Sequence, residues 1–227
     1  MTDFEAQRLV MVESQLRPNE VTEWRLLAAM RALPRERFVP PKLRGLAYMD
    51  EGIEIFPSID GAPARFLLAP MVLAKLIQLA AVGPEDAVLD VGCGTGYSTA
   101  ILAQLGDSVI GLEPEPELAE AARGSLRDLG VTNAEIVEGP LERGHSANAP
   151  YDVILVNGSV SEPPKTLLSQ LKEGGRLAVV LAGGANSGTQ GKAYLFVKVA
   201  GGASGLPYFD AGARLLPGFL AAPAFTF

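Results

Sequence analysis

From residue 67 onward, the chain alternates between two hydrophobic patterns. Short continuous apolar runs are typical of strands that are buried on both faces of a parallel sheet. Between them lie longer segments in which apolar residues recur at helical spacing. Strands that alternate with helices predict an α/β fold, with a parallel sheet and helices on both faces. The expected strands are residues 87–91, 108–112, 134–137, 151–156, 176–181 and 192–199, and the expected helices are 70–81, 98–105, 117–129 and 163–171.

The residues before position 67 show amphipathic helices instead of a run of strands. Residues 2–5 form a capping box in front of a first helix, and Thr22 is placed to cap a second helix over 23–33. A short strand is expected at 53–56. The pattern predicts a helical N-terminal extension and substrate-side segment over 1–66, a core over 67–200, and a C-terminal tail over 201–227 with a strand near Phe209 or at 224–227.

Three glycines at alternate positions follow the first core strand and precede a helix. Gly92, Gly94 and Gly96 can adopt positive φ in a tight turn, and they let the backbone approach a ligand without a Cβ in the way. Strand, glycine turn and helix form the phosphate- or nucleoside-binding corner of α/β folds. The fingerprint of dinucleotide-binding proteins would require glycine at position 97, where this chain has Tyr97.

Two acidic residues indicate which ligand this corner binds. Asp90 lies at the mouth of the first core strand, where its carboxylate would repel a pyrophosphate but suits a ligand with an ammonium group, such as S-adenosylmethionine (SAM). Glu113 ends the next strand, and an acid at that place accepts hydrogen bonds from ribose hydroxyls in nucleoside-binding folds. A glycine turn that binds nothing would account for the glycines but for neither carboxylate.

In an open parallel sheet, ligands bind outside the carboxyl ends of the strands. The loops after four expected strands meet at that edge, so their residues are candidates to bind the cofactor. These residues are Asp90, Gly92, Gly94, Thr95, Gly96, Glu113, Pro114, Pro140, Leu141 and Asn157.

Composition narrows the class of protein. The 227 residues carry a net charge of -7, which argues against general affinity for nucleic acid or anionic membrane. Cys93 is the single cysteine, so no internal disulfide is possible and a reducing cytoplasm fits. Its place in the glycine turn favours packing over catalysis. The only histidine, His145, lies in a polar loop, and no metal cluster is visible. The N-terminus lacks an apolar signal region.

Several longer blocks match one methyltransferase family. The segment DVGCGTGY at 90–97, with Glu113 downstream, resembles motif I and the acidic motif of class I SAM-dependent methyltransferases. The segment PRERFVP at 34–40 is similar to the PRExFVP signature of protein-L-isoaspartate (D-aspartate) O-methyltransferases, which is quite specific. Further similarities to that family are RLVMVESQLR at 8–17, AYMD at 47–50 followed by Ile53 and Ile55, APYD at 149–152 and QLKEGGRL at 170–177.

The resemblance implies a class I, Rossmann-like methyltransferase fold and transfer of a methyl group from SAM to a carboxylate. The sulfonium makes the methyl electrophilic, and a carboxylate is already a nucleophile near pH 7. The enzyme then mainly has to align the two groups and exclude water. No strong general base is needed, so we assign no catalytic residue. The acceptor, on a protein, a peptide or a small molecule, stays open, as does the oligomeric state.

Two stretches depart from the family pattern. Leu68 stands where the family has its active-site serine, and Phe66 replaces a threonine. The segment GPL at 139–141 replaces the family's GDG, whose acid contacts the adenine amino group. These changes predict altered adenine contacts and an acceptor pocket that has lost its polar side chain. If the loop before Leu68 is rearranged, Ser58 or Asp60 is an alternative source of that contact.

Three functions fit these residues: repair methylation of isoaspartyl proteins, methylation of a different, small or more apolar carboxylate, and SAM binding without transfer. A repair enzyme needs a polar cradle for the isopeptide carboxylate, which Leu68 does not offer. Arg65 is able to pair with an acceptor carboxylate, but as a charge in a loop rich in Gly and Pro it is expected to be solvated. We therefore expect weak or absent isoaspartyl methylation in a protein that binds SAM.

Overall fold

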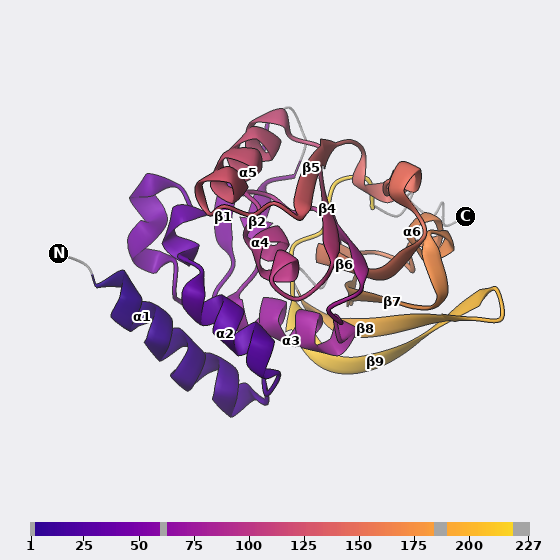
Figure 1. Ribbon diagram of the computed structural model, residues 1–227, viewed down its shortest axis with the longest axis horizontal. Coiled ribbons are helices and arrows are strands. Elements are labelled where there is room, and N and C mark those ends of the chain that lie inside the picture. The colour runs from indigo at the N-terminus through magenta and orange to yellow at the C-terminus, as the bar shows by residue number, and fades with distance from the viewer. Residues whose placement is uncertain (1–2, 60–62, 184–189, 220–227) are drawn as a thin grey trace, which may run out of the picture.

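A seven-stranded β-sheet forms the centre of the computed structural model, which describes residues 3–59, 63–183 and 190–219 (Figure 1). The strand order is β5-β4-β3-β6-β7-β8-β9, and a separate sheet pairs β1 with β2. The expected Rossmann-like α/β fold is confirmed. The strands are β1 (Ile53–Phe56), β2 (Arg65–Leu67), β3 (Ala87–Val91), β4 (Ser108–Glu113), β5 (Ala134–Glu138), β6 (Tyr151–Val160), β7 (Leu171–Ala182), β8 (Gln190–Val199) and β9 (Gly202–Gly212).

The N-terminal helices begin at caps that differ from the expected ones. Asp3 caps the first helix with its carboxylate, and Thr2 lies outside the described residues. Glu23 caps the second helix, so the prediction of Thr22 as the cap is wrong: the Thr22 amide donates to Gln78 instead.

No helix among the described residues is long and apolar enough to span a bilayer. The helices are α1 (Phe4–Val10), α2 (Trp24–Ala32), α3 (Pro70–Ala80), α4 (Tyr97–Ala103), α5 (Pro116–Asp128) and α6 (Lys165–Ser169), with shorter helical turns η1 (Met11–Leu16), η2 (Arg17–Asn19), η3 (Arg35–Arg37), η4 (Pro41–Leu46), η5 (Leu141–Arg143) and η6 (Ser146–Asn148).

The sheet is parallel from β5 through β7, but β8 and β9 run antiparallel to their neighbours. The prediction of a parallel sheet is therefore wrong for these two strands. The connection between β7 and β8, residues 183–189, is too short for the crossover of about a dozen residues that a parallel strand needs. Ala200 and Gly201, both at positive φ, form the two-residue turn into β9. The strand expected near Phe209 is part of β9, whereas 224–227 lie outside the described residues.

The strand β2 was not expected, because three residues are too few to show a hydrophobic period. It pairs antiparallel with β1, with Ile53 opposite Leu67, and so places Arg65 at the edge of the main sheet. The expected boundary between residues 66 and 67 falls inside this strand. The division of the chain into 1–66, 67–200 and 201–227 stays a prediction.

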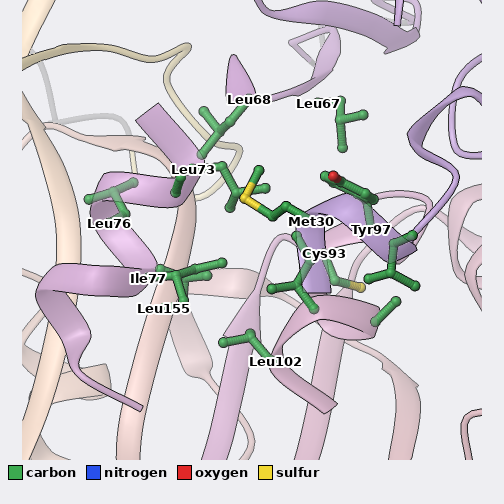
Figure 2. Close-up of a cluster of buried hydrophobic side chains, with 14 of the residues drawn as sticks. Met30, Leu67, Leu68, Leu73, Leu76, Ile77, Cys93, Tyr97, Leu102 and Leu155 are labelled. Carbon is green, nitrogen blue, oxygen red and sulfur yellow. The ribbon is translucent and has the colours of Figure 1, made fainter. Parts of the chain in front are cut away.

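Each face of the central sheet has its own hydrophobic cluster, because successive residues of a strand point to opposite faces. The first cluster contains Val88 and joins one face to α3, α4, α5 and the N-terminal helices. Figure 2 shows part of it, including Met30 from α2 and Cys93 from the turn after β3. The second cluster contains Leu89 and joins the other face to α6, η5, Leu216 and Phe219. The carboxyl ends of β3, β4 and β6 lie between these two cores.

The signature segment 34–40 has a structural role, which its buried arginine performs. Arg35 is 0% exposed, and its guanidinium donates to the carbonyl oxygens of Ala47 at 2.7 Å and Leu68 at 2.6 Å. The same guanidinium lies 4.9 Å from the ring centre of Tyr97, a favourable cation–π distance. Arg35 therefore fixes the chain just before α3 against the first turn of α4.

Replacing this arginine should destabilise the fold. We expect Arg35→Leu to lower the free energy of unfolding by roughly 2–6 kcal/mol, because two buried carbonyl groups each lose a donor at about 1–3 kcal/mol apiece. Arg37→Leu is the matched control: Arg37 lies in the same η3 turn, but its ion pair with Asp128 is exposed and is worth less than about 1 kcal/mol. Urea unfolding followed by circular dichroism measures both, and equal losses would contradict the role of Arg35.

Candidate functional site

The glycine turn joins β3 to α4 and has the backbone conformation that its sequence requires. Gly92, Gly94 and Gly96 have φ values of 76°, 57° and 91°, in the left-handed region that other residues rarely adopt. The Gly92 amide donates to the carbonyl of Leu112 in β4 at 2.8 Å, so the turn is attached to the neighbouring strand. A Cβ on Gly96 would lie 3.1 Å from the Cβ of Ala122, so this glycine lets α5 pack against the turn.

Asp90 is completely buried below the turn and is held by three neutral donors. The hydroxyls of Thr99 and Ser98 donate to it at 2.6 and 2.8 Å, and the side-chain amide of Asn157 donates to its other oxygen. Burial raises the pKa of Asp90 to about 6, while the hydrogen bonds from Thr99, Ser98 and Asn157 oppose that rise. The structure thus brings Asp90 and Asn157, from the ends of β3 and β6, into direct contact.

Glu113 ends β4 on the other side of the turn and is also 0% exposed. Its carboxylate accepts a charged hydrogen bond from Arg65, the amide of Gly94 at 2.8 Å and the amide of Glu115 at 3.3 Å. Burial raises the pKa of Glu113, and the Arg65 guanidinium and the two amides oppose this. Arg65 also donates to the carbonyl of Gly92 at 3.2 Å.

The prediction that Arg65 is a solvated loop charge is wrong. Its side chain is 2% exposed and is paired with Glu113 inside the predicted cofactor site. The reason is the pairing of β2 with β1, which turns this residue toward the sheet. Asp60, one of the alternative polar residues near the acceptor, lies outside the described residues, and Ser58 is exposed.

Two apolar side chains complete the cover over the glycine turn. A Cβ on Gly94 would lie 2.6 Å from the Cδ1 atom of Ile55 in β1. Leu216 covers the other side: a Cβ on Gly158 would be 2.5 Å from its Cγ, and one on Gly92 would be 3.4 Å from its methyl groups. Sequence reasoning missed Ile55 and Leu216 as site residues, because nothing in their local patterns distinguishes them from core residues.

The remaining predicted site residues occupy different environments. Thr95 donates its hydroxyl to the carbonyl of Phe38 at 2.7 Å. Pro114 is half-buried directly after Glu113, and Pro140 is exposed at the start of η5. Leu141 is 1% exposed and packs in the second hydrophobic cluster. The tight group at the edge of the sheet therefore consists of the glycine turn with the acids and the amide that flank it.

Cys93 lies in the same turn but has no exposed thiol. It is 2% exposed, and burial raises its pKa well above the usual value, with the carboxylates of Asp90 and Glu113 adding to the rise. A buried thiol of this kind stays protonated and is a poor nucleophile. Packing, as expected from the sequence, agrees with this environment.

A cavity of about 390 Å³ lies between the loop before β1, strand β2, the start of α3 and the end of β9. Its wall is mostly apolar and includes Leu68 and Phe66, the two positions that depart from the family pattern. The guanidinium of Arg214 lies 5.0 Å from the ring centre of Phe66, and Asp50 contributes an acid to the lining. Arg214 gave no signal in the sequence, because it follows a strand that had no clear period.

The buried acid of β3 predicts a pH dependence of stability. Between its ordinary pKa of 3.8 and about 6, Asp90 binds more protons in the folded than in the unfolded protein, so its contribution to stability falls as pH rises through this window. Relative to Asp90→Asn, the wild-type free energy of unfolding should fall by roughly 2 kcal/mol between pH 4 and pH 7. Denaturant titrations at several pH values test this, with exposed Asp107→Asn as the control. A constant difference between wild type and Asp90→Asn would contradict it.

The chain is similar to known proteins of one methyltransferase family. A family model of protein-L-isoaspartate(D-aspartate) O-methyltransferases matches residues 7–199. The protein-L-isoaspartate O-methyltransferase of Koribacter versatilis is 37% identical over 79% of this chain and 78% of its own length. That of Aeropyrum pernix is 40% identical over 78% of this chain and 67% of its own.

Solved structures show the same likeness in three dimensions. A protein-L-isoaspartate O-methyltransferase with 26% sequence identity superposes with a TM-score of 0.78, covering 96% of this chain and 67% of its own. A putative Plasmodium falciparum relative, in complex with S-adenosyl-L-homocysteine, shares the fold at a TM-score of 0.75 with 21% identity, over 95% of this chain and 99% of its own. The chain thus belongs to the protein-L-isoaspartate(D-aspartate) O-methyltransferase family and is a SAM-dependent methyltransferase of class I fold.

Proposed function

We propose that this protein transfers the methyl group of SAM to a carboxylate carried by a protein or peptide. The observation that supports this most is the pair of buried acids, Asp90 and Glu113, on either side of a positive-φ glycine turn at the ends of adjacent parallel strands. In a member of this family, such a corner suits a cofactor with an ammonium group at one end and a ribose at the other.

The two carboxylates match the chemical groups of SAM. The carboxylate of Glu113 suits the ribose hydroxyls, and the acid at Asp90 suits the charged methionine end. The Glu113 carboxylate is paired with Arg65 in the structure, so this acid has to exchange one partner for another. The residues that we propose to hold the cofactor are Asp90, Gly92, Gly94, Thr95, Gly96, Glu113, Pro114, Pro140, Leu141 and Asn157.

SAM supplies an electrophilic methyl group when it is bound. The protein has to bring an ionised carboxylate into line with that methyl and keep water away, which requires no general base. We place the acceptor in the cavity lined by Leu68 and Phe66. Arg214 lines this cavity and offers a positive charge to an acceptor carboxylate, while Leu68 and Phe66 supply an apolar wall.

The relatives are named for L-isoaspartate, but the lining of the cavity favours a second candidate acceptor. Leu68 offers no hydrogen bond to a carboxylate, and its neighbours Leu67 and Phe66 are also apolar. An acceptor with an apolar body fits such a wall better than a solvated isopeptide does. We therefore propose a carboxylate with an apolar neighbouring group as the preferred acceptor, with isoaspartyl peptides as weaker substrates.

We also propose that the reaction takes place in the cytoplasm. A net charge of -7 supports an acceptor that is neither nucleic acid nor an anionic membrane. The single cysteine, buried as a protonated thiol, supports a reducing, cytoplasmic location.

Labelled methyl transfer tests the proposed function. Incubation with methyl-labelled SAM should yield a base-labile methyl ester on peptides that carry an accessible carboxylate next to an apolar residue. The same peptides with the carboxylate replaced by an amide are the control and should stay unlabelled. No label on any carboxylate, together with no S-adenosylhomocysteine binding at millimolar concentration in calorimetry, would rule the function out.

Restoring a hydroxyl at position 68 should favour isoaspartyl peptides. A hydrogen bond to a charged group is worth about 1.5–3 kcal/mol, so we expect Leu68→Ser to raise isoaspartyl turnover by about 10- to 150-fold. Leu67→Ser, at the neighbouring cavity position and equally buried, is the control and should give no gain. Circular dichroism checks that both variants fold. Wild-type turnover already equal to that of the variant would contradict an apolar acceptor pocket.

A further inference from the structure

The acid that is proposed to bind the ribose is already occupied by a side chain of the same protein. Arg65 donates to Glu113 with one terminal nitrogen and to the carbonyl of Gly92 with the other. It therefore bridges the end of β4 and the glycine turn, the two places between which a nucleoside would lie. Arg65 is 2% exposed and Glu113 is 0% exposed, so neither group faces bulk solvent.

The surroundings of Arg65 make this a closed arrangement of the whole corner. Ile55 lies against the open side of Gly94, and Leu216 lies against Gly92 and Gly158. These glycines have no side chain that would keep a ligand away from the backbone. In this structure, side chains of the protein itself occupy the space beside them. A ligand that approaches the backbone of the turn has to displace these side chains as well as the guanidinium.

The hydrogen bonding of Arg65 is incomplete, although the side chain is buried. Its Nε atom has no hydrogen-bond partner within the described part of the chain. An unsatisfied buried donor of a charged group is costly, and this cost lowers the preference for the closed arrangement. Departure of Arg65 would in turn leave Glu113 buried without its cation, but ribose hydroxyls would restore donors to the carboxylate.

We propose that Arg65 is an internal competitor of the cofactor, which lowers cofactor affinity by holding Glu113 until SAM or its product displaces the guanidinium. This inference rests on the proposed function, because it concerns the same site. The apparent affinity of a ligand falls in proportion to the fraction of protein whose site is free. Arg65 thereby sets the cofactor concentration at which the enzyme begins to work.

Calorimetry with S-adenosylhomocysteine tests the competition. We expect Arg65→Met to bind this ligand at least ~10-fold more tightly than the wild type, since an open state of minor population, in general about 0.1–10%, would become the dominant one. Arg127→Met is the control: it removes the same charge from the exposed surface of α5 and should bind like the wild type. A variant that merely damaged the site would bind more weakly, so the direction of the change distinguishes competition from a structural role.

The calorimetry separates failure of the competition from failure of the proposed function. Equal or weaker binding by Arg65→Met, with clear binding by the wild type, overturns the competition and leaves the proposed function standing. No binding to wild type or variants at millimolar ligand overturns both. If Arg65→Met does not fold by circular dichroism, Arg65→Lys decides: it keeps the charge but loses the two-pronged guanidinium contact. If Arg65→Lys binds S-adenosylhomocysteine more tightly than the wild type does, competition is supported, and equal or weaker binding overturns it.

Discussion

The buried ion pair between Arg65 and Glu113 is the interaction on which the rest of the site depends. Both side chains are almost fully excluded from solvent, so each charge needs the other and the backbone groups around it. The pair connects β2 to the end of β4, and it reaches the glycine turn through the Gly92 carbonyl and the Gly94 amide. Removing one partner of such a pair leaves an uncompensated buried charge, at about 3–5 kcal/mol.

The two acids of the corner are held in different ways, and this difference matters for the cofactor. Asp90 accepts hydrogen bonds from two hydroxyls and an amide, all of them neutral and supplied by α4 and β6. Glu113 relies on a cation from a separate hairpin. The first environment is built into the core of the sheet, whereas the second can change when the hairpin side chain moves. The competition that we propose therefore acts at Glu113 and not at Asp90.

The segment 34–40, which resembles a family signature, holds the loop beside the cavity through buried hydrogen bonds. Arg35 fixes the carbonyls of Ala47 and Leu68, and Glu36 accepts a hydrogen bond from Tyr48 and pairs with Arg8. These contacts tie the N-terminal helices to the loop that lines the proposed acceptor cavity. The segment thus holds the backbone of this loop in place, and the departures at Leu68 and Phe66 change only its side chains.

The sequence by itself determined the strands of the core, the glycine turn and the acids at the ends of β3 and β4. These features depend on local periodicity and on backbone conformations that only glycine adopts readily, so they can be recognised within a short window. The antiparallel direction of β8 and β9 was missed, because it depends on connection length rather than on the apolar pattern of each strand.

Tertiary structure alone decided what covers the site. Arg65 meets Glu113 across 48 positions of the chain, and Leu216 meets Gly158 from the other end. A local window places Arg65 in a polar loop, yet the pairing of β1 with β2 turns it into the protein. A charged side chain is buried at low cost only when an opposite charge or hydrogen-bond partners lie beside it. When that partner is distant in the sequence, only the packing of the whole chain places it there.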